Sequence, residues 1–166
     1  MIVVSDTTPL ISLLKINQLD LLEKLFGEVL IPEAVFNELT VDERFQLEAQ
    51  LIRQKEFIAV KPVNNLESVS ILKRATGLDQ GESEAIVLTD ELKADLLLMD
   101  EAKGRNVSAQ MGLRIMGTIG ILIAAYEEHE LTSDEVREIE PAFPVLSECE
   151  SLFCISFYGA GTACAY

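Results

Sequence analysis

The sequence predicts an α/β sandwich built around a mostly parallel sheet. Short apolar runs alternate along the chain with segments of helical periodicity, which is the order expected for strands joined by right-handed crossovers. The clearest run, Leu96–Met99, is apolar at every position, as in a parallel strand buried on both faces. At 166 residues and 49% hydrophobic content, the chain has the size of one domain with a substantial core.

The first half of the chain opens on a short strand, Ile2–Asp6, which ends in an acid. Pro9 suits the first turn of the helix that follows, and Thr7 or Thr8 would be its cap. Gly27 and Gly77 are placed to close two later helices. The other elements expected in this half are helices at 19–26, 33–39, 42–55 and 64–74, and strands at 28–31 and 57–60.

The stretch 78–101 reads as a helix followed by the strand just described. Acids lie in the first turn of this helix, where the positive end of its dipole favours them. The strand is followed at once by Asp100, at the edge of a parallel sheet where ligands usually bind. The remaining predicted elements are a helix at 101–111, a strand at 114–116, and helices at 121–128 and 132–139.

The character of the chain changes after Pro141. The last 16 residues, 151–166, contain no charged side chain. We therefore interpret the chain as a domain at 1–140 followed by an uncharged tail at 141–166. An added edge element, an apolar contact surface and a poorly ordered end all fit the composition of this tail.

The composition argues against a secreted, membrane-spanning, disulfide-rich or zinc-binding protein. The N-terminus lacks the positive region of a secretory signal, and the longest apolar stretch, 115–126, is too short and glycine-rich to span a bilayer. Three cysteines, all in the last 18 residues and without a CxxC pair, argue against a disulfide framework or a zinc site. We expect a cytoplasmic protein with reduced thiols and no membrane partner. The net charge of −15 disfavours broad binding to phosphate backbones but allows acids neutralised by divalent cations, or a basic protein partner.

Two predicted strands end in an acid, Asp6 and Asp100. If these strands are neighbours, the two carboxylates face each other, and like charges that close are unfavourable unless a cation lies between them. Mg²⁺ and Mn²⁺ prefer carboxylate oxygens and keep several waters. A site of this kind activates water for phosphoryl chemistry. Taken alone, Asp6 fits better as a helix cap or turn residue, because Asp is common at strand-to-helix turns.

Four acids in this order and spacing resemble the acidic positions of the PIN-domain nucleases: Asp6, Glu38, Glu82 and Asp100. The segments SDTTPLI, LDQGESEAI, MDEAKGR and MGTIGIL resemble most closely the PIN-like branch found among prokaryotic toxin–antitoxin proteins. The resemblance covers roughly residues 1–140.

The resemblance implies a three-layer α/β/α fold and a Mg²⁺- or Mn²⁺-dependent ribonuclease. It implies Asp6 and Asp100 as direct metal ligands, with Glu38 and Glu82 completing the acidic pocket directly or through water. Glu84 and Asp79 remain alternatives to Glu82 as the third acid. The implied partners are an RNA substrate and an antitoxin protein, and a homodimer is expected because dimers are common among resembling proteins.

A second hypothesis is a catalytically inactive PIN-like protein that acts through protein–protein contacts. The complete set of acids favours the enzyme, whereas the strong negative charge and the apolar tail favour the binding protein. Other polar residues have structural interpretations: a solvated or capping role for Glu84 and Glu101, a surface helix end for His129, and a structural partner for Arg105.

Overall fold

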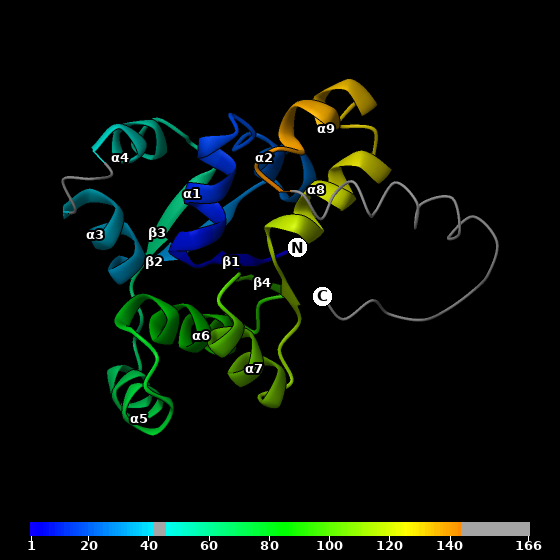
Figure 1. Cartoon of the computed structure of the whole chain (residues 1–166). Helices are drawn as coiled ribbons and strands as arrows, with labels where there is room; N and C mark the ends of the chain where they lie inside the picture. Colours follow the sequence, from blue (N-terminus) through cyan, green and yellow to red (C-terminus); the bar gives the residue numbers. More distant parts are fainter. Residues whose placement is uncertain (42–45, 144–166) are drawn as a thin grey trace.

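A computed structural model describes residues 1–41 and 46–143, which form a sheet between helical layers (Figure 1). The strands of this part of the chain are β1 (Val3–Ser5), β2 (Val29–Pro32), β3 (Ile58–Lys61), β4 (Leu96–Leu98) and β5 (Ile115–Met116). They form one sheet in the order β3-β2-β1-β4-β5, and every pairing is parallel. The predicted α/β architecture is therefore confirmed.

The first strand occupies the centre of the sheet. It pairs with β2 through Val3 opposite Val29, and with β4 through Ser5 opposite Leu98. The two acid-tipped strands predicted from the sequence, β1 and β4, are consequently neighbours. Their carboxyl ends meet at one edge, which is the edge where open parallel sheets bind ligands.

Helices cover both faces of the sheet (Figure 1). The described helices are α1 (Thr7–Lys15), α2 (Leu21–Phe26), α3 (Glu33–Val41), α4 (Gln46–Arg53), α5 (Leu66–Thr76), α6 (Gln80–Leu92), α7 (Ala102–Gln110), α8 (Thr118–Glu127) and α9 (Ser133–Ile139). Helices α1, α2, α8 and α9 lie on one face, and α5, α6 and α7 on the other. Helix α3 contacts both α1 and α6, so it joins the two layers.

The hydrophobic core is split in two by the sheet, because successive strand residues point to opposite faces. Val3 and Leu98 pack with the layer of α1, α2 and α8. Val4 and Leu97 pack with the layer of α5 and α6. This double burial explains why β4 is apolar throughout and confirms the three-layer sandwich.

Some predicted boundaries are wrong in detail. The first residue of α1 is Thr7, and its N-cap position is taken by Asp6 rather than by Thr7 or Thr8. Helix α8 begins at Thr118, three residues before the predicted start, because Asp100 accepts a hydrogen bond from the Thr118 N–H. The helix predicted at 42–55 is described only as α4, and residues 42–45 lie outside the described residues.

The predicted tail at 141–166 lies outside the described residues from residue 144 onward. Gly27 and Gly77 follow the ends of α2 and α5, as predicted. Thr132 and Glu135 form a capping box at the start of α9. Among the described helices, none has both the length and the apolar character needed to cross a membrane.

A candidate acidic active site at the sheet edge

Asp6 follows the central strand and is almost fully buried. Its backbone N–H donates to the Leu98 carbonyl at 3.0 Å, which fixes the residue beside the end of β4. Only 3% of its surface is exposed. Although Asp6 stands at the N-cap position of α1, its side chain makes no capping hydrogen bond. The carboxylate is therefore left available for another partner.

Glu38 and Asp6 border one small space above Gly81. A methyl group built on Gly81 would lie 3.2 Å from Glu38 Oε2 and 3.6 Å from Asp6 Oδ1. Glu38 is positioned from α3 by the Thr7 hydroxyl, which donates to its Oε2 at 2.7 Å. The missing side chain at Gly81 thus leaves open a space onto which two carboxylates converge.

Asp79 and Glu82 form the capping box of α6. The Asp79 side chain accepts from the Glu82 N–H at 2.8 Å, and Glu82 Oε2 accepts from the Asp79 N–H at 2.9 Å. This pair satisfies two backbone donors of the first helical turn and fixes where Gly81 lies. The Asp-x-x-Glu spacing at 79–82 is the signal in the sequence by which this cap could have been found.

Burial and neighbouring acids raise the pKa values of Asp6 and Glu82. Burial raises the pKa of the Asp6 carboxyl to about 7, a hydrogen bond from the Thr7 backbone opposes this rise, and the charges of Asp79, Glu82 and Glu38 add to it. Burial also raises the pKa of Glu82, where the charges of Asp79 and Glu101 act in the same direction. Ionised carboxylates are thus disfavoured here without a positive partner.

Asp100 has a different environment at the end of β4. Its Oδ1 accepts from the Thr118 N–H at 2.7 Å, and its Oδ2 accepts from the Thr118 hydroxyl at 2.5 Å. A side chain on Gly117 would lie 2.8 Å from Asp100 Oδ1, so this close approach requires glycine. Asp100 therefore anchors the start of α8 to the sheet edge.

A cleft of about 480 Å³ opens beside this acidic site, between the first turns of α3 and α6. Its lining includes three residues of the site itself: Glu38, Asp79 and Gly81. The remaining lining residues, which are polar apart from Ala34, are Glu33, Ala34, Asn37, Gln80 and Glu84. The cleft is thus acidic and rich in hydrogen-bonding groups.

The other acids and bases considered from the sequence have structural contacts or are exposed. Glu84 accepts from the Ala34 N–H at 3.0 Å, near the start of α3, which is the capping role expected for it. Arg105 donates to the Met99 carbonyl at 3.0 Å, at the end of β4. His129 is exposed after α8 with a positive φ of 61°, as expected for a surface helix end.

The structure brings together Asp6, Glu38, Asp79 and Glu82, but places Asp100 against Thr118. In the described part of the chain, no set of three or more His, Cys, Asp or Glu side chains has the arrangement of a metal site. Two carboxylates are nevertheless enough for Mg²⁺, which keeps waters and takes further oxygens from a substrate phosphate. The Asp6–Glu38 pair at the open space above Gly81 fits that requirement.

Comparison with known families gives one assignment. A family model described as a PIN domain matches residues 2–145. No curated protein gives a significant match to the chain.

Proposed function

Because the chain belongs to the PIN-domain family, which is a family of nucleases that generally use divalent metals, we propose that it is a Mg²⁺- or Mn²⁺-dependent endoribonuclease. The observation that carries this proposal is the convergence of Asp6 and Glu38 on the space left by Gly81. The raised pKa of Asp6, caused first by burial and then by neighbouring acids, supports a cation as the missing partner.

Within this proposal Asp6 and Glu38 hold the cation, while Glu82 and Asp100 complete the acidic edge. A divalent cation held by these residues would activate water and stabilise the charge that develops on the phosphate. Asp6 contributes a buried carboxylate whose position is fixed by the pairing of β1 with β4. Glu38 contributes a more exposed carboxylate whose orientation is fixed by Thr7.

The attacking group in this proposal is water, because the site offers no side chain suited to nucleophilic attack. The Thr7 hydroxyl is already donated to Glu38, and the single histidine is exposed after α8. The cleft, which Glu38 and Gly81 line, would give the substrate access to the Glu38 carboxylate and to the space above Gly81. We assign this activity to a nuclease domain at 1–140, with the tail at 141–166 as an addition.

We further propose that the protein is the toxin of a toxin–antitoxin pair that acts in the cytoplasm, and that it forms a homodimer. The net charge of −15 and the acidic cleft suit a basic antitoxin segment. Induced expression should arrest growth of a bacterial host, and Asp6→Asn should relieve the arrest. Growth arrest that persists with Asp6→Asn would contradict the toxin role.

The alternative is an inactive PIN-domain protein that acts through protein contacts. One observation favours it: both carboxylate oxygens of Asp100 are hydrogen-bonded to Thr118. In that case Asp100 is a structural anchor only, and the acidic cleft is a surface for a basic protein.

Cleavage of a mixed RNA pool in Mg²⁺, in Mn²⁺ and in EDTA separates these functions. We expect cleavage with either metal, none in EDTA, and a loss on the order of a hundredfold for Asp6→Asn, as for other losses of transition-state charge stabilisation. His129→Ala is the control and should cleave like the wild type. Cleavage that survives EDTA or Asp6→Asn would contradict the mechanism, and no cleavage with any metal would favour the inactive protein.

A further inference from the structure

An acidic protein that cleaves RNA must place some positive charge where the substrate enters. The chain has 28 acids and only 13 lysines and arginines. Several described cations are paired with carboxylates, among them Lys24 with Glu130 at 3.1 Å and Arg137 with Asp134 at 2.8 Å. Cations beside the acidic site that contact uncharged groups, and not carboxylates, are therefore candidates for binding the substrate.

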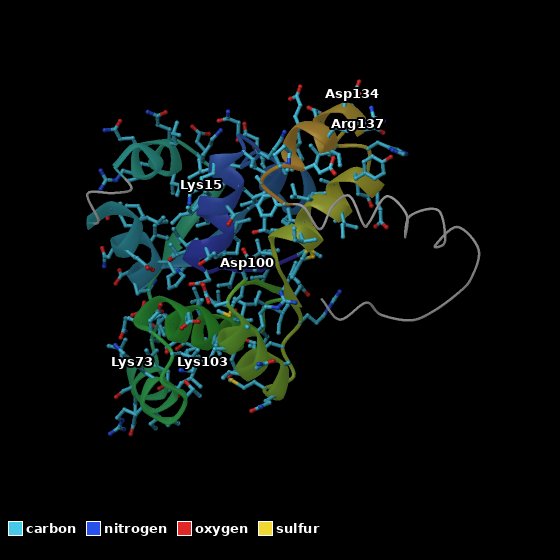
Figure 2. The ribbon with its side chains drawn as sticks, viewed as in Figure 1. Lys15, Lys73, Asp100, Lys103, Asp134 and Arg137 are labelled. Atoms are coloured by element: carbon cyan, nitrogen blue, oxygen red, sulfur yellow. The ribbon has the colours of Figure 1, made fainter. Side chains whose placement is uncertain are left out.

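Two lysines of this kind flank the turn between α5 and α6. Lys103 Nζ donates to the Gly77 carbonyl at 2.7 Å, and Lys73 Nζ donates to Gln80 Oε1 at 3.1 Å. Both side chains are exposed, and both lie in the layer of α5, α6 and α7 (Figure 2). In the described residues neither ammonium has a carboxylate within 4.0 Å.

The turn that Lys73 of α5 and Lys103 of α7 flank leads directly into the acidic site. Gly77 is followed, two residues later, by the Asp79–Glu82 capping box. Gly104, the residue after Lys103, packs against Glu82: a methyl group built on Gly104 would lie 3.1 Å from Glu82 Oε1. Lys103 therefore begins from backbone that lies beside the acidic site.

Lys73 is linked to the wall of the cleft. Gln80, which accepts from Lys73, lines the cleft and donates through its Nε2 to Glu84 Oε1 at 2.7 Å. Glu84 in turn accepts from the Ala34 N–H at the opposite wall. This chain of hydrogen bonds fixes Gln80, and with it the position of the Lys73 ammonium at the rim.

We propose that Lys73 and Lys103 bind backbone phosphates of single-stranded RNA where the strand enters the acidic site. An ammonium has three donors, and each of these lysines has one of them in a described hydrogen bond, so donors remain for a phosphate oxygen. The inference rests on the proposed nuclease function and assigns the substrate-contacting residues of that same site.

The two lysines also have a structural use, because positive charge near the end of α5 favours its helix dipole. That use affects folding stability but not RNA affinity. Lysine and arginine both satisfy it, and both bind phosphate, whereas glutamine keeps a polar side chain without the charge. The Lys→Gln and Lys→Arg variants therefore separate charge from shape.

The test is binding of a fluorescein-labelled single-stranded RNA by anisotropy in EDTA, where no cleavage takes place, at salt concentrations from about 50 to about 300 mM. Lys73→Gln and Lys103→Gln should each weaken binding several-fold at low salt, and each should lower the slope of log K against log salt by about 0.7. The Lys73→Arg and Lys103→Arg variants should bind like the wild type. Arg137→Gln removes one charge on α9 and is the matched control, with unchanged affinity expected.

The outcomes distinguish this inference from the proposed function. In one outcome, the wild type and the double Lys→Gln variant bind RNA with equal affinity and equal salt slope while the wild type cleaves RNA in Mg²⁺. That result would overturn the lysine contacts and leave the proposed nuclease function intact. A lower melting temperature with unchanged affinity would reduce the lysines to helix caps. A wild-type protein that neither binds nor cleaves RNA would overturn both proposals.

Discussion

Asp6 and Asp100 both lie just beyond the ends of neighbouring strands, yet their surroundings are opposite. Asp6 follows β1, is 3% exposed, makes no capping hydrogen bond through its side chain, and has a pKa raised to about 7 by burial and by other acids. Asp100 follows β4, is partly exposed, and accepts two hydrogen bonds from Thr118. For Asp6, the hydrogen bond from the Thr7 backbone is outweighed by burial and by neighbouring acids, whereas Asp100 has two hydrogen bonds from Thr118 built into the fold.

The difference shows that the position of an acid at a strand end does not determine its role. The neighbouring helix determines it: α6 presents Gly81 and more acids to Asp6, whereas α8 presents an N–H and a hydroxyl to Asp100. We therefore expect the ionised Asp6 carboxylate to lower the free energy of unfolding because it is held in the acidic site. We expect Asp100 to raise the free energy of unfolding through its hydrogen bonds to Thr118.

The largest expected effect is on the pH dependence of stability in EDTA. Asp6 binds its proton more tightly in the folded protein, with a pKa of about 7, than in the unfolded chain, where the ordinary value is 3.8. Asp6 therefore contributes most to the free energy of unfolding below pH 3.8, where it is protonated in both states. This contribution, up to about 4 kcal/mol, is lost as the pH rises to the folded-state pKa of about 7. Urea unfolding at about pH 5 and about pH 8 measures the part of this loss that falls between those two pH values, roughly 2–3 kcal/mol.

Asp6→Asn should remove much of this pH dependence and should be more stable than the wild type at the higher pH. Asp100→Asn is the matched control and should keep the dependence. A marked fall in the stability of Asp6→Asn at the higher pH would make Asp6 a structural cap and erase the contrast between the two acids.

The next effect in size is the loss of the Asp100 anchor. Asp100→Ala removes the acceptor for the Thr118 N–H and hydroxyl, which are partly buried, and should lower the free energy of unfolding by about 1–3 kcal/mol. Thr118→Val, which removes only the hydroxyl, should cost less. If the stability of Asp100→Ala equalled that of the wild type, the Thr118 contacts would carry no net energy.

The smallest expected change in stability accompanies Gly81→Ala, which alters no charge. The added methyl would lie 3.2 Å from Glu38 Oε2 and 3.6 Å from Asp6 Oδ1, in the space proposed for the cation. Stability should stay equal or rise by up to about 1 kcal/mol, because alanine favours a helix over glycine.

Gly81→Ala should nevertheless lower RNA cleavage by about tenfold, which corresponds to about 1.4 kcal/mol in the activation barrier. Paired cleavage assays and melting curves test the two expectations together. Full activity in a stable Gly81→Ala protein would show that the space above Gly81 is not where the cation binds.

The order of the elements could be predicted from the sequence because each depends on a local pattern. The apolar run in β4 and the glycines after α2 and α5 are patterns of this kind. The start of α8 could not be predicted in the same way, because it depends on Asp100, 18 residues earlier in the chain.

The candidate site was predictable only in outline. From the sequence, two strands end in acids whose carboxylates would meet only if the strands were neighbours, and the pairing of β1 with β4 comes from the structure. The separate environments of Asp6 and Asp100 have no signal in the local sequence. The space above Gly81 depends on α3 packing against α6, which places residues 43 positions apart beside each other and leaves no local signal. The lysines at the α5–α6 turn were also missed, because surface lysines are common and only their contacts distinguish these two.

The central position of β1 has a consequence for how the protein folds during synthesis. One neighbour of β1 is β4, and the Ile2 N–H bonds to Asp95, 93 residues later in the chain. At about 5–20 residues per second, translation of that interval takes roughly 5–20 s, and until then one edge of β1 has no partner strand. A nascent chain that stops before β4 cannot form the edge where Asp6 lies beside the end of that strand. Long-range pairing of this kind therefore delays assembly of the acidic site until most of the domain has been made.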